Sequence, residues 1–255
     1  MNLLAICVGN TRTRIGTFVD NMLKHTNVLS NANFAVLNRQ LERAYQPIRA
    51  KEGAVVLLAS TSPPIGRQVI DAIKQHLHTA VVQVEQDLPV PIGRQLDPEA
   101  IVGDDRLLNA AAAYDVLQQA CVVVDAGTAI TVDFVDGAGT FHGGAIAPGA
   151  QMMLKSLAQQ TSQLPDVDLS EPMETIGHNT VDAIRCGVFY GLRGMVRELT
   201  ERYAELAGVY PMIIATGGDA ELLFSGYELV DRVVPDLTLL GMKLTLAGPA
   251  GKTKQ

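Results

Sequence analysis

The chain has 255 residues, of which 47% are hydrophobic and 18% are charged, so it is long enough for one large or two medium domains with real cores. Its formal net charge of −7 argues against a nonspecific nucleic-acid binder and favours a small-molecule substrate. The sequence lacks an apolar run of the roughly 20 residues that a membrane span needs, and it lacks the basic start of a secretory signal. We therefore expect a cytoplasmic protein without a membrane partner.

The first third of the sequence alternates predicted strands with predicted helices. Pro64 suits the first turn of a helix, and the apolar positions that follow it recur at helical spacing. Strands are expected over residues 3–6, 15–18, 22–29, 54–60 and 81–84, and helices over residues 37–48 and 64–77. Hairpins combined with strand–helix alternation predict an α/β fold with mixed sheets flanked by helices.

An irregular segment ending at Gly103 precedes a predicted helix over residues 107–117, which contains four consecutive alanines. Asp104 is placed to cap this helix, so Asp105 and Arg106 lie in its first turn. On a structural interpretation the acids complement the helix dipole and the arginine is exposed. On a functional interpretation Asp105 takes a proton from a substrate hydroxyl and Arg106 holds an anionic group. The local sequence leaves both open.

Residues 122–134 predict a buried strand, a tight polar turn and a half-buried strand. The turn contains Asp125, Gly127 and Thr128. Glycine allows close approach of a ligand, backbone N–H groups and hydroxyls bind phosphate oxygens, and an aspartate at a strand end can hold a cation or a water. The alternative is an ordinary hairpin.

A second copy of this strand–turn–strand pattern opens the chain, with the polar turn at residues 7–11. Cys7 stands in this copy where Asp125 stands in the later one. Two such hairpins, one in each half, predict an internally duplicated fold whose halves face each other across a nucleotide.

The second half continues with small residues over 143–149, which indicate close backbone packing, and with helices over 151–159 and 181–206. Thr180 is predicted to cap the longer helix. The strand over residues 211–215 ends in a turn containing Gly217 and Gly218, a third ligand-binding type of turn on which an adenosine could lie. The three cysteines are far apart, which favours structural burial over a disulfide or zinc site. We expect the tail over residues 252–255 to be frayed.

Taken in order, the motifs resemble those of the type III pantothenate kinases, and the resemblance covers nearly the whole chain. The motifs are Gly-Asn-Thr at 9–11, Gly-x-Asp-Arg at 103–106, Asp-x-Gly-Thr-Ala at 125–129, Gly-Gly-Ala-Ile-Ala-Pro-Gly at 143–149, Leu-Pro at 164–165, Gly-x-Asn-Thr at 177–180 and Thr-Gly-Gly at 216–218. The family belongs to the superfamily of actin, hexokinase and the heat-shock chaperone ATPases. The resemblance implies two similar α/β lobes, an N-terminal one over residues 1–115 and a C-terminal one over residues 116–255.

The resemblance implies phosphorylation of pantothenate by ATP with Mg²⁺, the first step of coenzyme A biosynthesis, in a homodimer. Asp105 is then the general base, and Asp125 is the ligand of a monovalent cation, K⁺ or NH₄⁺. Pantothenate contacts are implied for Gly103, Asp104, Arg106, Thr180 and Leu96. ATP contacts are implied for Cys7, Val8, Gly9, Asn10, Thr11, Arg12, Thr13, Arg14, Thr128, Gly217 and Gly218.

The sequence departs from the family pattern at a few of these positions. The family's first loop begins with an aspartate, where Cys7 stands here, and it usually closes with lysine, where Arg14 stands. A thiol is a poor magnesium ligand, because that ion prefers oxygen donors. Leu96 replaces a frequent aromatic residue. Asp104 is an extra acid, which either replaces the missing carboxylate or raises the pKa of Asp105 by repulsion.

Three hypotheses follow from these departures. The leading one is an active, slow pantothenate kinase. The second is an impaired family member that binds its ligands and acts as a regulatory or accessory protein, which Cys7 favours and the retained Asp105, Arg106, Asp125 and Thr128 oppose. The third is a kinase for another small hydroxyl substrate, for which Leu96 is the reason.

Overall fold

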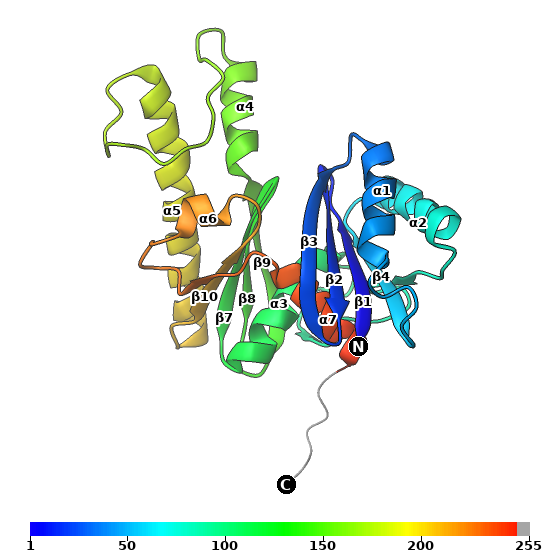
Figure 1. Ribbon diagram of the computed structural model, residues 1–255. Coiled ribbons are helices and arrows are strands. Elements are labelled where there is room, and N and C mark those ends of the chain that lie inside the picture. Colours follow the sequence, from blue (N-terminus) through cyan, green and yellow to red (C-terminus); the bar gives the residue numbers. More distant parts are fainter. Residues whose placement is uncertain (249–255) are drawn as a thin grey trace. The chain divides into compact units, whose positions relative to one another are not determined.

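The computed structural model describes residues 1–248, so the expected frayed tail lies outside the described residues (Figure 1). Contacts divide the chain into two compact units. Unit 1 comprises Met1–Ile92, Glu99–Ala112 and the described residues from Leu237 onward, and unit 2 comprises Gly93–Pro98 and Ala113–Asp236. In the described part of the chain, no helix is both long and apolar enough to cross a membrane.

Unit 1 is built around a sheet with the strand order β3-β2-β1-β4-β5. Its strands are β1 (Asn2–Val8), β2 (Arg12–Val19), β3 (Met22–Ser30), β4 (Ala54–Ser60) and β5 (Val82–Gln83). β1 pairs antiparallel with β2 and parallel with β4. Every β1 residue except Cys7 is buried, as the apolar run over residues 3–6 predicts. The sheet therefore has its core strand directly before the first polar turn.

Helices α1 (Phe34–Tyr45) and α2 (Pro63–Leu77) pack beside each other and against this sheet (Figure 1). Asn33 caps α1 by accepting a hydrogen bond from the Val36 N–H at 3.2 Å, and a proline stands at each of the first two positions of α2. Their apolar faces and the strands share one core, which includes Leu4, Ile6, Val8, Leu37, Leu41, Val56, Leu58, Val69 and Ile73.

Unit 2 contains a second mixed sheet with the strand order β11-β10-β7-β8-β9-β6. Its strands are β6 (Gly93–Arg94), β7 (Cys121–Ala126), β8 (Ala129–Val135), β9 (Thr140–Pro148), β10 (Met212–Thr216) and β11 (Arg232–Val233). Its helices are α4 (Ala150–Gln160), α5 (Thr180–Ala207) and α6 (Ala220–Phe224). The small residues over 143–148 lie in β9, and Gly149 is the N-cap of α4. A side chain at Gly144 would collide with the Val132 carbonyl of β8.

The two sheets share one topology, which confirms the predicted duplication. The run β9-β8-β7-β10-β11 repeats the order of β3-β2-β1-β4-β5, so β1 corresponds to β7 and β4 to β10. In both sheets the central strand has an antiparallel hairpin partner on one side and a parallel partner on the other. Two similar lobes of mixed sheet flanked by helices are thus present.

The units differ from the expected division after residue 115. Helix α3 (Asp104–Leu117) passes from unit 1 to unit 2 after Ala112, and α7 (Leu237–Ala247) returns to unit 1. Thr238 Oγ1 of α7 donates to Asn109 Oδ1 of α3 at 2.8 Å, and Gly241 lies against the Leu108 backbone. Helix α7 therefore completes the first lobe through contacts with residues distant in sequence, although it follows unit 2 along the chain.

Candidate functional site

The first loop lies at the turn between β1 and β2. Cys7 and Val8 end β1, and Gly9 N–H donates to the Arg12 carbonyl at 2.9 Å across Asn10 and Thr11. The last predicted loop residues, Thr13 and Arg14, belong to β2, where Thr13 is opposite Val8 and Arg14 opposite Cys7. The structure therefore brings all the predicted residues of this loop together in one hairpin end.

Asn31, just after β3, braces this loop and was missed by the sequence analysis. Its N–H donates to the Thr11 carbonyl at 3.0 Å, and its Nδ2 donates to the Gly9 carbonyl at 2.8 Å. Its Oδ1 accepts a bond from Thr13 Oγ1 at 2.7 Å. These bonds fix both sides of the turn, so that its remaining backbone N–H groups keep one arrangement.

The end of β4 joins the loop to the predicted substrate turn, and this too was missed. Thr61 N–H donates to the Val8 carbonyl at 3.0 Å, while Ser60 N–H donates to Asp104 Oδ2 at 3.2 Å. The first loop and the start of α3 are therefore both hydrogen-bonded to the end of β4, through the adjacent residues Thr61 and Ser60. The Asp104 carboxylate serves as a structural acceptor in this tie.

Asp105 lies in the first turn of α3 with one oxygen already held. Its Oδ1 accepts the Arg106 N–H at 2.8 Å, and a side chain on Gly103 would place its Cβ 2.6 Å from the same oxygen. Burial raises the pKa of Asp105, and the Arg106 N–H and guanidinium oppose that rise. Desolvation, rather than repulsion from Asp104, is therefore what makes this carboxylate more basic.

Unit 2 gathers the predicted residues of the other half. Gly127 N–H donates to the Ala129 carbonyl at 2.9 Å, which turns the chain around Thr128 at the end of β7. Gly217 follows β10 with a φ of +100°, a conformation that glycine adopts readily. A Cβ there would lie 2.5 Å from Asp125 Oδ1. Asp125 and Gly217 are thus packed directly together, and Gly218 follows in the same turn.

Leu96 belongs to a different compact unit from the predicted substrate turn. It belongs to unit 2, whereas Gly103–Arg106 belong to unit 1, and its Cδ2 lies 3.4 Å from the position that a Cβ on Gly143 would occupy. β6 pairs with β9, which carries this segment into the second sheet. Within unit 2, Leu96 is therefore a neighbour of β9.

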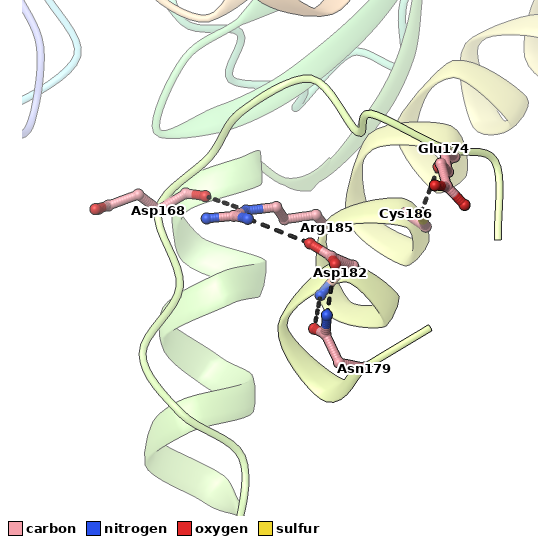
Figure 2. Close-up of polar contacts among 6 residues, drawn as sticks. All are labelled: Asp168, Glu174, Asn179, Asp182, Arg185 and Cys186. Atoms are coloured by element: carbon pink, nitrogen blue, oxygen red, sulfur yellow. Dashed lines mark hydrogen bonds and ion pairs between the residues drawn. The ribbon is translucent and has the colours of Figure 1, made fainter. Parts of the chain in front are cut away.

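The start of α5 differs from the prediction, because Asn179 and not Thr180 is the N-cap (Figure 2). Asn179 Oδ1 accepts the Asp182 N–H at 2.9 Å, and Asn179 Nδ2 donates to Asp182 Oδ2 at 2.6 Å. Arg185 then bonds Asp182 Oδ1 at 3.4 Å and the Asp168 carbonyl at 3.5 Å. The helix starts one residue earlier than predicted, which leaves Thr180 exposed in its first turn.

Among the side chains able to ligate a metal, Cys121 lies in the core and Cys186 lies on α5. Burial raises the pKa of Cys121 to about 12, so its thiol is inert, as expected for a core cysteine. The Cys186 thiol donates to the Glu174 carbonyl at 3.3 Å (Figure 2). Among residues 1–248 there is no group of three or more His, Cys, Asp and Glu side chains arranged to hold a metal.

Comparison with known proteins identifies the family. The profile described as type III pantothenate kinase matches residues 3–202. This chain belongs to the type III pantothenate kinases. A type III pantothenate kinase of Dehalococcoides mccartyi is 33% identical over 252 residues, which cover 95% of this chain and 96% of that protein. The motif-based resemblance is thereby confirmed.

Solved structures show the same fold at low identity. A conserved putative Baf family transcriptional activator from Campylobacter jejuni is 20% identical to this type III pantothenate kinase with a TM-score of 0.61, covering 94% of this chain and 95% of that one. MreB 5 of Spiroplasma citri bound to AMPPNP is 13% identical with a TM-score of 0.51, covering 95% of both chains. The fold is that of the actin-like ATPases, as predicted.

Proposed function

We propose that this chain transfers the γ-phosphoryl group of ATP to the primary hydroxyl of pantothenate, with Asp105 as the general base. Membership of the type III pantothenate kinases gives the reaction, which is the first step of coenzyme A biosynthesis. The observation that supports the role of Asp105 is its setting. It is a desolvated carboxylate with a raised pKa, at a turn tied through Ser60 and Thr61 to the first loop. A base with a raised pKa accepts a proton more readily at neutral pH.

Substrate binding is assigned to the turn around this base. Asp105 Oδ1 is held by the Arg106 N–H, which leaves Oδ2 to accept the hydroxyl proton as the substrate oxygen bonds to phosphorus. Arg106 suits the carboxylate of pantothenate, because a guanidinium binds carboxylates bidentately. Gly103 and Asp104 shape the turn, and Thr180 and Leu96 are proposed as further contacts with pantothenate.

Nucleotide binding is assigned to the two strand–turn–strand ends and the glycine pair. The loop from Cys7 to Arg14 and Thr128 would bind phosphate oxygens through N–H groups, hydroxyls and guanidinium groups. Gly217 and Gly218 would lie against the adenosine. We also propose that the Asp125 carboxylate holds the activating K⁺ or NH₄⁺, since its oxygens can coordinate K⁺ or accept hydrogen bonds from NH₄⁺.

Of the two residues at matching positions, Asp125 and Cys7, only Asp125 suits the divalent metal that accompanies ATP. Mg²⁺ keeps several waters and takes one or two carboxylates plus substrate phosphates, so Asp125 is a suitable donor and Cys7 is not. When bound, the ion neutralises charge on the phosphates. Arg12 and Arg14 of the first loop carry positive charge, which would also neutralise charge on the phosphates.

The alternatives are a ligand-binding protein with impaired chemistry, for which Cys7 is the reason, and a kinase for another small hydroxyl substrate, for which Leu96 is the reason. The match to the family over most of the chain favours the kinase. The desolvated setting of Asp105 also fits a general base, because desolvation of a carboxylate raises its pKa.

The test is a coupled ADP-release assay with ATP, Mg²⁺, pantothenate and either K⁺ or Na⁺, with Asp105→Asn as the variant. We expect pantothenate-dependent turnover that needs K⁺ and falls by about 10²- to 10⁴-fold in the variant. Asp115→Asn, an exposed position on α3, is the matched control. Absence of turnover together with a rise in melting temperature on adding ATP or pantothenate would support the binding-protein hypothesis instead.

We propose a homodimer as well. Large apolar side chains are exposed on β9 and in the α4–α5 connection of unit 2, including Ile146 (63% exposed), Met173 (96%) and Ile176 (71%). Burying these side chains against a second copy would be favourable. Light scattering of the wild type should give twice the chain mass, and Met173→Asp combined with Ile176→Asp should give a monomer. A monomeric wild type would contradict the assignment.

A further inference from the structure

A cleft of about 690 Å³ lies in unit 1, outside all the residues assigned above to the kinase reaction. It is bounded by α1 on one side and by β2 and β3 on the other. Its volume falls within the range of about 300–1,000 Å³ that is typical of small-molecule sites. Because the first loop and the substrate turn do not line it, the kinase reaction leaves this cleft without a role.

Hydrogen bonds between strand and helix fix the cleft walls. Thr17 and His25 are paired across β2 and β3, and Thr17 Oγ1 donates to the Ala44 carbonyl in the last turn of α1 at 2.8 Å. Farther along the same strand face, Asn27 Nδ2 donates to Gln40 Oε1 of α1 at 3.2 Å. The positions of the two cleft walls are therefore set by hydrogen bonds within unit 1.

The inner part of the cleft is largely apolar and its mouth is polar. Ile15 and Ala44, which line it, are 1% and 7% exposed. His25, Arg39 and Arg43 also line it and are exposed. A ligand that fits this arrangement has an apolar body toward the sheet and a charged group toward the helix.

The charges at the mouth select an anion. Arg39 and Arg43 are four residues apart on α1 and thus share one helix face. Arg39 uses only its Nε, which donates to the Ala35 carbonyl at 3.4 Å, and among residues 1–248 the side chains of Arg43 and His25 have no polar partner. The acid at the mouth, Glu42, has its Oε1 3.3 Å from His76 Nδ1 of α2.

We infer that this cleft is a binding site for a small organic anion, an apolar molecule that carries a phosphate or carboxylate group. Two guanidinium groups on one helix face bind either oxyanion through charge-assisted hydrogen bonds. The chain as a whole has a net charge of −7 and repels anions, so such a cluster of cations is a local exception that serves to attract one. Pro47, which also lines the cleft and is exposed, supplies contact surface for the apolar body beside the small accessible parts of Ile15 and Ala44.

The experiment is an NMR titration of the full chain, with its nucleotide site saturated by a non-hydrolysable ATP analogue. Phenyl phosphate and benzoate are the anionic probes, and benzyl alcohol is the neutral control. The amide signals of His25, Thr26 and Asn27 report on the cleft. The variant is Arg39→Gln with Arg43→Gln, and the matched control is Arg49→Gln, an exposed arginine that does not line the cleft.

We expect at least one anion to shift these amides saturably, with binding weakened about tenfold or more in the double variant and unchanged in the control. Which probe binds distinguishes phosphate from carboxylate. Kinase turnover of the double variant should match the wild type, which separates this site from the reaction. The inference is overturned if neither anion gives saturable shifts, if benzyl alcohol binds equally well, or if Arg49→Gln weakens binding as much as the double variant.

Discussion

The turns after β1 and after β7 hold the same place in two sheets of one topology, yet they differ in length and in chemistry. Gly9 bonds to Arg12 across two residues, whereas Gly127 bonds to Ala129 across one. Asp125 is the second-to-last residue of the strand before the shorter turn, and Cys7 holds the same position in the strand before the longer one. Duplication has therefore kept the hairpin while the carboxylate remains in unit 2 only.

The chain segments after β4 and β10 also share a backbone contact and differ in the residues around it. In unit 1 Thr61 N–H donates to the Val8 carbonyl at 3.0 Å, and in unit 2 Asp219 N–H donates to the Ala126 carbonyl at 2.9 Å. Counted from the paired strands, the second connection has one more residue, and Gly217 accommodates it with its positive φ. Both units therefore have this backbone hydrogen bond, and they differ in the length and residues of the connection beside it.

Among changes at the two matching turns, the largest loss of kcat is expected from removing the Asp125 carboxylate in unit 2. Asp125→Asn should lower kcat by about 10²- to 10³-fold and abolish the difference between K⁺ and Na⁺, because the cation loses a charged ligand. Steady-state kinetics in each salt is the measurement, with Asp115→Asn for comparison. A variant that keeps its K⁺ activation would show that the cation binds elsewhere.

Next in size is the glycine that accommodates the extra residue. Gly217→Ala should lower the free energy of unfolding by about 2–3 kcal/mol, because its Cβ would press on Asp125 Oδ1 in a left-handed conformation. Gly226→Ala, also at a positive φ but with nothing within 4 Å of its Cβ, should cost about 1 kcal/mol. Urea unfolding monitored by circular dichroism compares them, and equal costs would contradict the close packing.

A smaller effect is expected from making the two hairpins alike. Cys7→Asp should raise kcat about tenfold, because a carboxylate is a better magnesium donor than a thiol. Cys7→Ala should stay within about twofold of the wild type, since it adds no ligand. An unchanged rate in Cys7→Asp would mean that the metal depends on unit 2 and the phosphates alone.

The smallest effect concerns the stability cost of the buried base. Burial raises the folded-state pKa of Asp105 above its unfolded-state value. The ionised carboxyl therefore lowers the free energy of unfolding progressively as the pH rises from the unfolded-state pKa, and fully above the folded-state pKa. Asp105→Asn should therefore melt at a higher temperature than the wild type near neutral pH, and this advantage should fade as the pH falls. Calorimetric scans at several pH values would show it, and an advantage that grows toward acid pH would contradict the sign.

The sequence was sufficient for the duplicated fold because each hairpin is a local pattern of apolar strand, polar turn and apolar strand. It was insufficient for the residues that hold the site together. Asn31 contacts side chains and carbonyls 18 and 22 positions away, and the Ser60–Asp104 bond spans 44 positions. The cap at Asn179 was missed for a different reason, since a threonine beside an asparagine offers two acceptable caps and only the backbone path selects one.

The return of α7 to the first sheet has a consequence for how the protein is made. Leu239 of α7 fills the space beside Gly16 of β2, and Thr238 is bonded to Asn109. Unit 1 therefore lacks part of its core until residues 237–247 have left the ribosome, whereas every residue of unit 2 has by then been synthesised. The lobe that is begun first is the one completed last.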